Sequence, residues 1–304
     1  DYMTIKNIGI IGYGSIGQKH HQILASLSDE FEFFILTQQK GVLNSFSTLE
    51  SLSTVDLDYI IISNATSLHY ESLKFLDERY KKIRFLIEKP LFHNVQSFDG
   101  QSNLYFVGYN LRFHQIIDEF IKLIRGKSII SIAMKTYSYL PQWRKNINYQ
   151  SSSSAFKSKG GGVLRDLSHE VDLVNFLFGT PNFLYADSRK ISQLDIETDD
   201  YLLACGQLDC GAPFNIELNY FSRFNSREIF VETSQESIKL DLANCNLEVI
   251  GDKKSFVEHD IDINSSYKAM HQAIMSDNFE NVCSLQEAML VLQQIEQIEH
   301  LSSS

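Results

Sequence analysis

The segment from Ile8 to Gly17 reads IGIIGYGSIG and decides how the rest of the chain is interpreted. Its first half is an apolar run short enough for a buried strand, and its second half spaces three glycines as G-x-G-x-x-G. Residues 18–27 can follow as a helix. This order of strand, glycine loop and helix is typical of a dinucleotide-binding segment, whereas the glycine spacing alone would be weak evidence.

Each glycine of this loop has a separate physical task. Gly12 allows the tight turn, Gly14 lets the backbone approach a pyrophosphate, and Gly17 lets the helix pack closely on the strand. The free N–H groups and partial positive charge at the start of the helix suit phosphate groups. The cofactor-binding residues predicted here are Gly12, Gly14, Ser15, Ile16 and Gly17.

Length and charge limit the class of protein. The 304 residues suffice for two domains that each bury a core. Acidic residues outnumber Lys and Arg by 38 to 27, which argues against nucleic acid or an anionic membrane as a partner. No apolar run is long enough to span a membrane and no signal peptide opens the sequence, so we expect a cytoplasmic protein. The four cysteines show no disulfide framework, and no cluster has the spacing of metal ligands.

The second predicted strand, residues 31–36, ends where such folds usually place an acid on the ribose 2′-hydroxyl. This chain has Thr37, Gln38, Gln39 and Lys40 there. A hydroxyl, two amides and a cation can bind a 2′-phosphate, and no carboxylate repels it. The pattern therefore favours NADP slightly over NAD, with Thr37 and Gln38 as contacts. In the alternative, the amides bind the ribose of NAD.

Strands and helices alternate over the first part of the chain. Further strands are predicted at 58–63, 85–87 and 104–108, with a helix at 70–80. The alternation predicts a doubly wound parallel sheet, a Rossmann domain covering residues 1–113. Ligands of such sheets bind at the carboxyl ends of the strands. The candidate residues at those ends are Asn64, His69, Glu88, Lys89, Tyr109, Asn110 and Arg112, of which the first four are assigned to the cofactor.

From Ser128 onward turns replace helices between the predicted strands. We expect a largely antiparallel sheet in a second α/β domain, residues 114–304. Its strands are placed at 129–139, 183–190, 201–208, 214–220, 228–233 and 237–242, and its helices at 163–178, 266–275 and 284–300. The last helix can pack back on the first domain. Apolar residues alternate in two of the strands and suggest that the far face of the sheet is buried in a partner: Ile229, Val231, Ile238, Leu240 and Leu242.

Four motifs occur in a fixed order: the glycine loop, Glu88-Lys89-Pro90, residues 108–113 (GYNLRF), and residues 160–172 with three glycines followed by Asp166, His169 and Asp172. Together they resemble the Gfo/Idh/MocA family of oxidoreductases, and the resemblance covers essentially the whole chain. It implies a Rossmann domain joined to an open-faced α/β domain, a bound nicotinamide cofactor, a sugar or cyclitol substrate, and dimers or tetramers formed through the open sheet.

The resemblance also implies catalytic roles. Oxidation of a secondary alcohol needs a base for the hydroxyl proton, a cation for the developing alkoxide and a carboxylate that orients the base. His169, Lys89 and Asp166 are assigned these roles. His169 follows Asp166 by three residues, where the commoner family pattern has four. This departure leaves open whether Asp166 or Asp172 orients the histidine.

The periodicity of residues 163–178 agrees with this assignment. At about 100° per residue, six apolar residues form one stripe of the predicted helix, while Asp166, His169 and Glu170 gather on the opposite side. We expect that side to face a cleft. The alternative is a polar face turned only to solvent.

Charge is distributed unevenly along the chain. From Phe120 to Arg165 there is no acid among 46 residues, which hold nine cations. Five of those cations fall in the irregular segment 141–165, with Trp143 and Tyr149. A basic, aromatic, mobile loop suits an anion, so we expect an acidic substrate such as a nucleotide-linked sugar or a sugar carboxylate. The predicted substrate residues are Tyr109, Asn110, Arg112, Trp143, Arg144, Tyr149, Lys157, Arg165 and Asp172.

The sequence therefore predicts an NAD(P)-dependent oxidoreductase that moves hydride between nicotinamide and a secondary alcohol or ketone of a sugar. Two alternatives stay open. One is a glycosidase that uses tightly held NAD for transient oxidation. The other is a regulator that only binds dinucleotide, although the presence of Lys89 and His169 counts against it.

Overall fold

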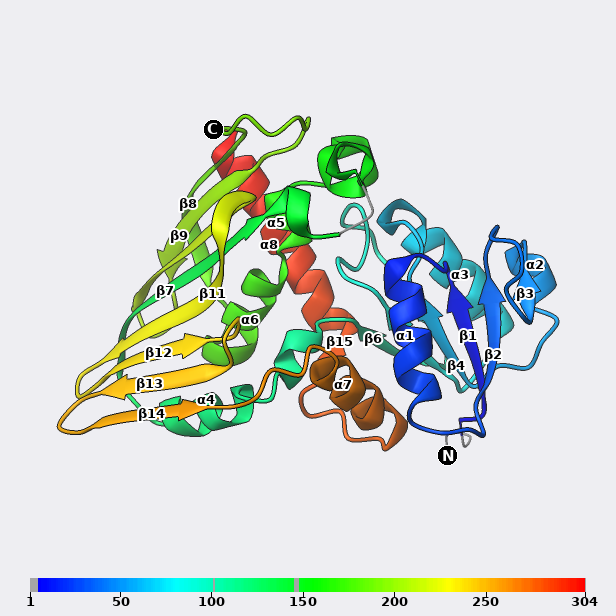
Figure 1. Cartoon of the computed structure of the whole chain (residues 1–304), viewed down its shortest axis with the longest axis horizontal. Coiled ribbons are helices and arrows are strands. Elements are labelled where there is room, and N and C mark those ends of the chain that lie inside the picture. Colours follow the sequence, from blue (N-terminus) through cyan, green and yellow to red (C-terminus); the bar gives the residue numbers. More distant parts are fainter. Residues whose placement is uncertain (1–4, 101, 145–147, 304) are drawn as a thin grey trace. The chain divides into compact units, whose positions relative to one another are not determined.

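The structure is a computed structural model that describes residues 5–100, 102–144 and 148–303, which fall into two units (Figure 1). The first unit comprises the chain up to residue 110 together with residues 264–292, and the second comprises 111–263 and 293–304. The sequence suggested a single boundary after residue 113. The division differs because α7 (Ser265–Met275) packs on α1 (Ser15–Ala25), which brings a late segment into the first unit.

The sheet of the first unit has seven strands in the order β15-β6-β5-β4-β1-β2-β3. All neighbouring strands run parallel except β15, which pairs antiparallel with β6. The central strands are continuous apolar runs because both of their faces are covered; all four residues of β4 are buried. The strands are β1 (Asn7–Ile11), β2 (Glu32–Leu36), β3 (Ser45–Phe46), β4 (Tyr59–Ile62), β5 (Arg84–Ile87), β6 (Leu104–Val107) and β15 (Cys283–Ser284).

The helices of the first unit include α1, α2 (Leu49–Leu52), α3 (His69–Arg79) and α7. The buried side of α1 carries Gly17, His20, Ile23 and Leu24, at the spacing of one helical face. The final helix, α8 (Leu285–Ser302), begins in the first unit and ends in the second. The predicted Rossmann architecture is confirmed.

The sheet of the second unit has eight strands in the order β14-β13-β12-β11-β7-β10-β9-β8. Only β7 and β10 pair parallel; every other neighbouring pair is antiparallel, as the sequence predicted. The strands are β7 (Ile129–Tyr139), β8 (Asn182–Arg189), β9 (Tyr201–Gln207), β10 (Pro213–Asn219), β11 (Phe221–Thr233), β12 (Ser237–Asp241), β13 (Asn246–Ile250) and β14 (Lys254–Glu258). The sequence missed β13 and β14; all five residues of β14 are exposed, so it carries no apolar alternation.

The apolar residues of β11 and β12 face the core and not the far side of the sheet. Ile229, Val231, Ile238, Leu240 and Leu242 are at most 5% exposed. The residues between them form the opposite face, where Lys239 pairs with Glu228 at 2.5 Å and the Tyr137 hydroxyl donates to Glu217 at 2.6 Å. The expectation that those five apolar residues meet a partner is therefore wrong, because they already pack inside their own domain.

The predicted helix over 163–178 is two helices, α5 (Val163–Asp166) and α6 (His169–Phe178). Leu167 ends α5 with a ψ of 32°, and its N–H bonds back to the carbonyl of Val163. The break invalidates the single helical wheel: Glu170 and Asp172 are almost fully buried, and so is most of His169. A further helix, α4 (Ile117–Ile124), was not predicted.

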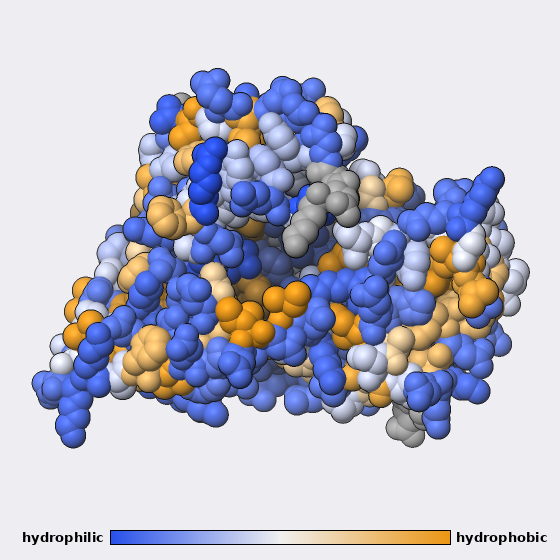
Figure 2. All heavy atoms as spheres, in the orientation of Figure 1, coloured by the Kyte–Doolittle hydropathy of each residue, from blue (hydrophilic) through white to orange (hydrophobic). Residues whose placement is uncertain are grey.

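The surface agrees with the polar composition. The face drawn in Figure 2 is mostly hydrophilic, with smaller hydrophobic patches between. None of the helices in the described part of the chain has the length and apolar character needed to cross a bilayer.

Candidate active site

The glycine loop joins β1 to α1 in a geometry that only glycine permits at two positions. Gly12 has a φ of +90°, and a Cβ there would lie 2.5 Å from the Asn64 Cα. A Cβ on Gly17 would lie 2.1 Å from the Gly12 carbonyl oxygen. By contrast, a Cβ on Gly14 would meet nothing within 4 Å. The loop is therefore packed tightly at both ends and open at its middle.

The first turn of α1 is arranged for an anion. Gly14 precedes the helix without a side-chain cap, and no acidic residue lies in the first turn. The N–H groups of Ser15 and Ile16 thus begin a helix whose open end offers partial positive charge. Asn64, packed against the loop, donates to Ser72 at 2.9 Å, whereas its buried Oδ1 has no hydrogen-bond partner in the described structure. An open backbone cradle and an unsatisfied buried acceptor fit a dinucleotide with donor groups.

The residues after β2 connect back to this loop. The Gln39 amide donates to the Tyr13 carbonyl at 2.7 Å, and the Gln39 N–H donates to the Thr37 hydroxyl at 3.1 Å. Gln38 donates to the Ser47 carbonyl at 2.8 Å. The sequence analysis named Gln39 among the residues that could bind a 2′-phosphate but did not predict its bond to the Tyr13 carbonyl, which ties the end of β2 to the glycine loop.

His69 has a different place from the one expected. It is 1% exposed, with Nδ1 3.1 Å from the Leu91 carbonyl and Nε2 3.2 Å from the Asn64 carbonyl. Burial lowers its pKa, and the two carbonyls oppose that shift. Since both ring nitrogens face backbone oxygens, His69 braces the Asn64 loop in place of the predicted contact with cofactor.

Glu88 and Lys89 follow β5, and the Lys89-Pro90 peptide is cis. Glu88 is turned into the domain: its Oε1 lies 2.8 Å from His20 Nε2, and its Oε2 accepts from the Lys89 N–H at 3.2 Å. Only 6% of Glu88 is exposed. Its carboxylate therefore contacts a histidine of α1, and its predicted contact with the cofactor stays a prediction, while Lys89 lies in the bend that follows β5.

Tyr109 and Asn110 lie just beyond β6 and are also buried. The Asn110 amide donates to the Ser266 hydroxyl at 2.7 Å. This bond joins the predicted motif to α7 and gives Asn110 a structural role, whereas its predicted substrate contact stays a prediction.

In the second unit, Asp166 and His169 flank the break between α5 and α6. The hydroxyl of Tyr220, at the end of β10, donates to Asp166 Oδ2 at 2.5 Å. Burial raises the pKa of Tyr220 well above its usual value, and the charge of Asp166 adds to the effect. Trp143 packs edge-on against the Tyr220 ring, with centroids 5.2 Å apart. Sequence reasoning missed Tyr220, because no local pattern links it to a residue 54 positions earlier.

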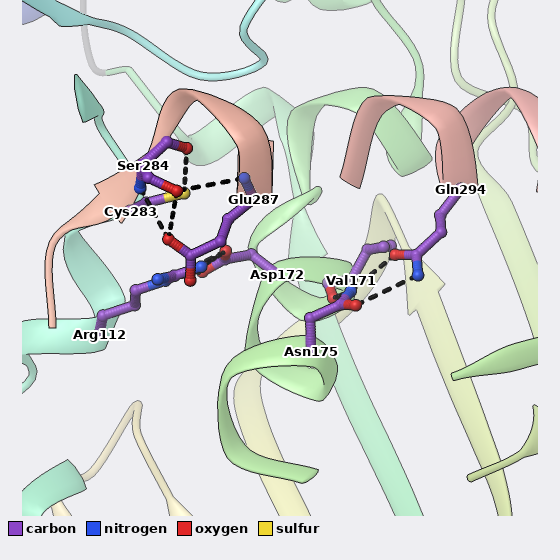
Figure 3. Close-up of polar contacts among 8 residues, drawn as sticks. All are labelled: Arg112, Val171, Asp172, Asn175, Cys283, Ser284, Glu287 and Gln294. Carbon is purple, nitrogen blue, oxygen red and sulfur yellow. Dashed lines mark hydrogen bonds and ion pairs between the residues drawn. The ribbon is translucent and has the colours of Figure 1, made fainter. Parts of the chain in front are cut away.

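Arg112 and Asp172 form a buried ion pair, drawn in Figure 3. Arg112 Nη2 lies 2.6 Å from Asp172 Oδ1, and Arg112 Nε lies 3.0 Å from Oδ2. The side chains are 2% and 0% exposed. The guanidinium also lies over the Phe176 ring, 4.8 Å from its centroid. Because the two side chains bind each other and are buried, neither is available for the substrate contact that the sequence suggested.

Glu170 forms a second buried polar cluster on α6. Its Oε1 accepts from the Thr136 hydroxyl at 2.7 Å and lies 2.8 Å from Arg227 Nε. Its Oε2 is buried and has no partner among the described residues. Thr136 and Arg227 also line a cavity of about 220 Å³. Its other lining residues are Leu111, Ser138, Trp143, Leu167, Asn225, Ser226, Leu242 and Ala243.

Trp143, Arg144 and Tyr149, predicted as substrate residues, come together around a much smaller cavity of about 10 Å³, with Leu140, Ser152 and Ser154. Trp143 lines both cavities. Short 3-10 turns make up residues 149–159, and the Thr198 hydroxyl holds them by donating to the Ser154 carbonyl at 2.7 Å.

The remaining predicted cations have different surroundings. Arg165 binds Glu299 of α8 through two bonds of 2.7 and 2.9 Å, so the expected substrate contact is replaced by an ion pair. Lys127 pairs with Glu236. Lys157 is exposed, and Lys145 lies outside the described residues. Arg144 is thus the predicted cation that the structure groups with aromatic residues at a cavity.

Two family models match this chain. The NAD-binding Rossmann fold of the Gfo/Idh/MocA oxidoreductases matches residues 6–103, and their C-terminal alpha/beta domain matches residues 121–303. The chain belongs to the Gfo/Idh/MocA oxidoreductase family. The resemblance inferred from the four motifs is confirmed, and the first unit is the NAD-binding domain of a Gfo/Idh/MocA protein.

Known proteins agree with this assignment. The scyllo-inositol 2-dehydrogenase (NADP(+)) of Bacillus subtilis strain 168 is 26% identical over 218 residues, 65% of this chain and 58% of that enzyme. The WlbA dehydrogenase of Bordetella pertussis, solved with NADH and UDP-GlcNAcA, has a TM-score of 0.81 and 17% identity, covering 100% of this chain and 97% of that one. Levoglucosan dehydrogenase in complex with NADH has a TM-score of 0.83 at 17% identity, covering 98% and 97%. The two solved structures share the fold throughout.

Proposed function

We propose that this chain is an NAD(P)-dependent sugar oxidoreductase, in which Lys89 and His169 act on a secondary alcohol or ketone of the substrate. The observation that carries the proposal is the break between α5 and α6. It begins α6 at His169, and Leu167, two residues earlier, lines the cavity of about 220 Å³. A titratable side chain thus begins a helix next to a pocket with polar walls, in a chain whose other domain binds NAD.

The base is His169. It accepts the hydroxyl proton when an alcohol is oxidised and returns it when a ketone is reduced. Asp166 is the better candidate for the carboxylate that orients the imidazole, because Asp172 is already bound to Arg112 through both oxygens. Tyr220 holds Asp166 in turn, by the hydroxyl bond of 2.5 Å. This supports a series in which Tyr220 holds the carboxylate of Asp166 and Asp166 orients the imidazole of His169.

The cation is Lys89, which stabilises the negative charge that develops on the reacting oxygen. The cofactor is held by the backbone of Gly12 to Gly17, by Asn64 and by Thr37, and the nicotinamide supplies the hydride acceptor or donor when bound. The absence of an acid from Thr37 to Lys40 supports NADP as a cofactor bound at least as tightly as NAD. The named activity of the Bacillus subtilis relative, which uses NADP(+), agrees.

The substrate is a sugar that carries an acidic group. The cavity beside α6 is smaller than the roughly 300–1,000 Å³ of drug-sized ligand pockets and suits a single sugar ring. Because Glu170 neutralises Arg227, the pair is suited to hydroxyl groups. The exposed Arg144, beside Trp143 and Tyr149, suits an anionic group that extends from the sugar, and Trp143 lines both cavities. A nucleotide-linked acidic sugar was bound by the WlbA dehydrogenase.

Turnover with separate cofactors and substrates tests this proposal. We would incubate the protein with NAD⁺ or NADP⁺ and either a UDP-linked uronic sugar or a free neutral sugar, following reduced nicotinamide and sugar product together. Equal amounts of oxidised sugar and reduced cofactor are expected for the acidic substrate. Hydrolysed sugar without net reduction would indicate the glycosidase instead, and cofactor binding with no turnover of any sugar would favour a regulator.

The predicted substrate charge has its own test. Arg144→Ala and Lys157→Ala should raise KM for the acidic sugar, and rising salt should reduce the difference from wild type, since ionic strength screens exposed charges. Lys190→Ala, at an exposed cation outside both cavity linings, is the matched control. Efficient turnover of a neutral sugar that neither variant changes would contradict an acidic substrate.

A further inference from the structure

Four polar side chains form one buried row inside the NAD-binding domain. The Tyr59 hydroxyl on β4 lies 3.0 Å from Nδ1 of His271 on α7. Nε2 of His271 lies 2.8 Å from Nδ1 of His20 on α1. Nε2 of His20 lies 2.8 Å from Glu88 Oε1, at the end of β5. The first three residues have 0% exposure, so the row is closed to water along most of its length.

The chemistry of the groups gives this row a direction. An ionised Glu88 can only accept, so His20 must donate from Nε2. A neutral imidazole carries one N–H, hence His20 Nδ1 accepts from His271 Nε2. By the same rule His271 Nδ1 accepts the proton of the Tyr59 hydroxyl. In this order every polar atom of the row is satisfied with both rings neutral.

The reverse order is less favourable. His271 would then donate to Tyr59 from Nδ1, and the hydroxyl proton would lose the one partner that the described residues give it. His20 would also need both ring protons to donate to His271 and Glu88. Burial holds the pKa of His271 well below its usual value, and the neighbouring His20 adds to that effect, which agrees with a neutral ring.

The row ends at the backbone of Lys89. Glu88 Oε2 accepts from the Lys89 N–H at 3.2 Å. The other oxygen is packed against residue 108, where a Cβ would lie 2.7 Å from Oε1. The Glu88 carboxylate is thus held by His20 on one side and by residues 89 and 108 on the other. The backbone of Lys89 starts next to this held carboxylate.

Two cations, Lys19 and Arg84, interact electrostatically with members of the row. Burial lowers the pKa of Lys19, and the charge of Glu88 opposes that shift. Burial raises the pKa of Tyr59 well above its usual value, while Arg84 opposes and Glu88 adds to the effect. Tyr267 closes the side of the row with its ring edge-on to His20, 5.4 Å between centroids. These neighbours favour a protonated Tyr59, whose hydroxyl can then donate to His271.

We propose that Tyr59, His271 and His20 are positioning residues whose one-way hydrogen-bond row holds the Glu88 carboxylate in place and so fixes the backbone of Lys89. The role of Lys89 in turnover rests on the proposed function, whereas the direction of the row does not. Three segments far apart in sequence, on β4, α1 and α7, thereby act on the strand end that carries the proposed catalytic cation.

Ring-nitrogen NMR of the full chain without cofactor tests the direction. Both His20 and His271 should be neutral and protonated at Nε2. Tyr59→Phe keeps the ring but removes the donor, and it should change the ring-nitrogen signals of both histidines and shift the Lys89 amide signal. Tyr80→Phe is the matched control, because its buried hydroxyl donates to the Val55 carbonyl, away from the row. A wild-type His271 protonated at Nδ1, or a Tyr59→Phe variant with unchanged signals, would overturn the proposal.

Turnover gives a second measurement. His20→Gln retains an N–H donor, whereas His20→Ala removes the donor to the buried Glu88 Oε1. We expect kcat to fall about tenfold or more in His20→Ala and to recover most of that loss in His20→Gln, with about a three- to tenfold fall in Tyr59→Phe. The Kd for dinucleotide should change less than about twofold, since Tyr59, His20 and His271 are fully buried and cannot contact a bound ligand. A kcat equal to that of wild type in all three folded variants would show that the row does not position Lys89. Failure of wild-type protein to oxidise any sugar would count against the proposed function only, and the NMR result would then decide whether the row has the proposed direction.

Discussion

Burial changes what a charged residue can do in this protein. Arg112 and Asp172 each occur in a motif that suggests ligand binding, yet they satisfy one another inside the second unit. Arg165 with Glu299 repeats the pattern nearer the surface. A buried charge is costly unless it is paired, so an arginine close to a core carboxylate binds that carboxylate before any ligand. Sequence shows the charge of a residue but not the neighbour that neutralises it.

The Arg112–Asp172 pair should therefore matter for stability. Asp172→Leu leaves the Arg112 charge buried without its partner and should cost about 3–5 kcal/mol of unfolding free energy. The double variant Arg112→Met/Asp172→Leu removes both charges and should cost clearly less than the single one. Denaturant unfolding of wild type, Asp172→Leu, Arg112→Met and the double variant measures this, and a double variant as unstable as the sum of both single changes would contradict the assignment.

Two elements organise the sites in different ways. The glycine loop and α1 are specified locally, by spacing within ten residues, and the sequence was sufficient to predict them. The segment with Asp166 and His169 is not, because the break at Leu167 and the support from Tyr220 depend on packing against β10. The apolar residues of 163–178 recur with the period of a helix, so the sequence predicted one continuous helix. Contacts with the rest of the domain instead favour two helices, α5 and α6.

The glycine loop offers a matched pair of substitutions. A Cβ on Gly17 would lie 2.1 Å from a backbone oxygen, so Gly17→Ala should lower the thermal midpoint by several degrees. A Cβ on Gly14 meets no protein atom, so Gly14→Ala should keep the midpoint while raising the Kd for dinucleotide about tenfold or more, by blocking approach to the backbone. Calorimetry and cofactor titration measure both. Unchanged cofactor affinity in a folded Gly14→Ala protein would place the pyrophosphate elsewhere.

In the molecule as a whole, the sequence pattern predicted the two sheets but not the long-range contacts that complete the sites. Buried parallel strands are continuous apolar runs, and the strands of the second sheet alternate, so sequence indicated both. The partners that complete the sites are distant in the chain: His20 and His271 are 251 residues apart. The exposed strand β14 and the return of α7 to the first unit leave no local signal either.

Buried histidines make the stability of the molecule depend on pH. Burial lowers the pKa of His271 well below the ordinary 6.5, and it lowers those of His69 and His114 as well. Below pH 6.5 the unfolded chain binds protons that the folded chain does not, so the free energy of unfolding should fall as pH drops through 6.5. Denaturant midpoints between about pH 7.5 and 5.5 test this. His271→Asn should show a shallower decline, and a midpoint that rises on acidification would contradict the account.

We propose that His169 performs acid–base chemistry on a sugar while the other domain holds the dinucleotide. The most direct measurement compares wild type with His169→Ala for turnover of the oxidised sugar and for dinucleotide affinity. We expect turnover to fall by about two to four orders of magnitude, the range of general acid–base groups, with Kd for the dinucleotide nearly unchanged. Lys89→Ala should show a comparable loss of turnover. Near-normal turnover by a folded His169→Ala protein on the substrate that wild type oxidises would contradict the account.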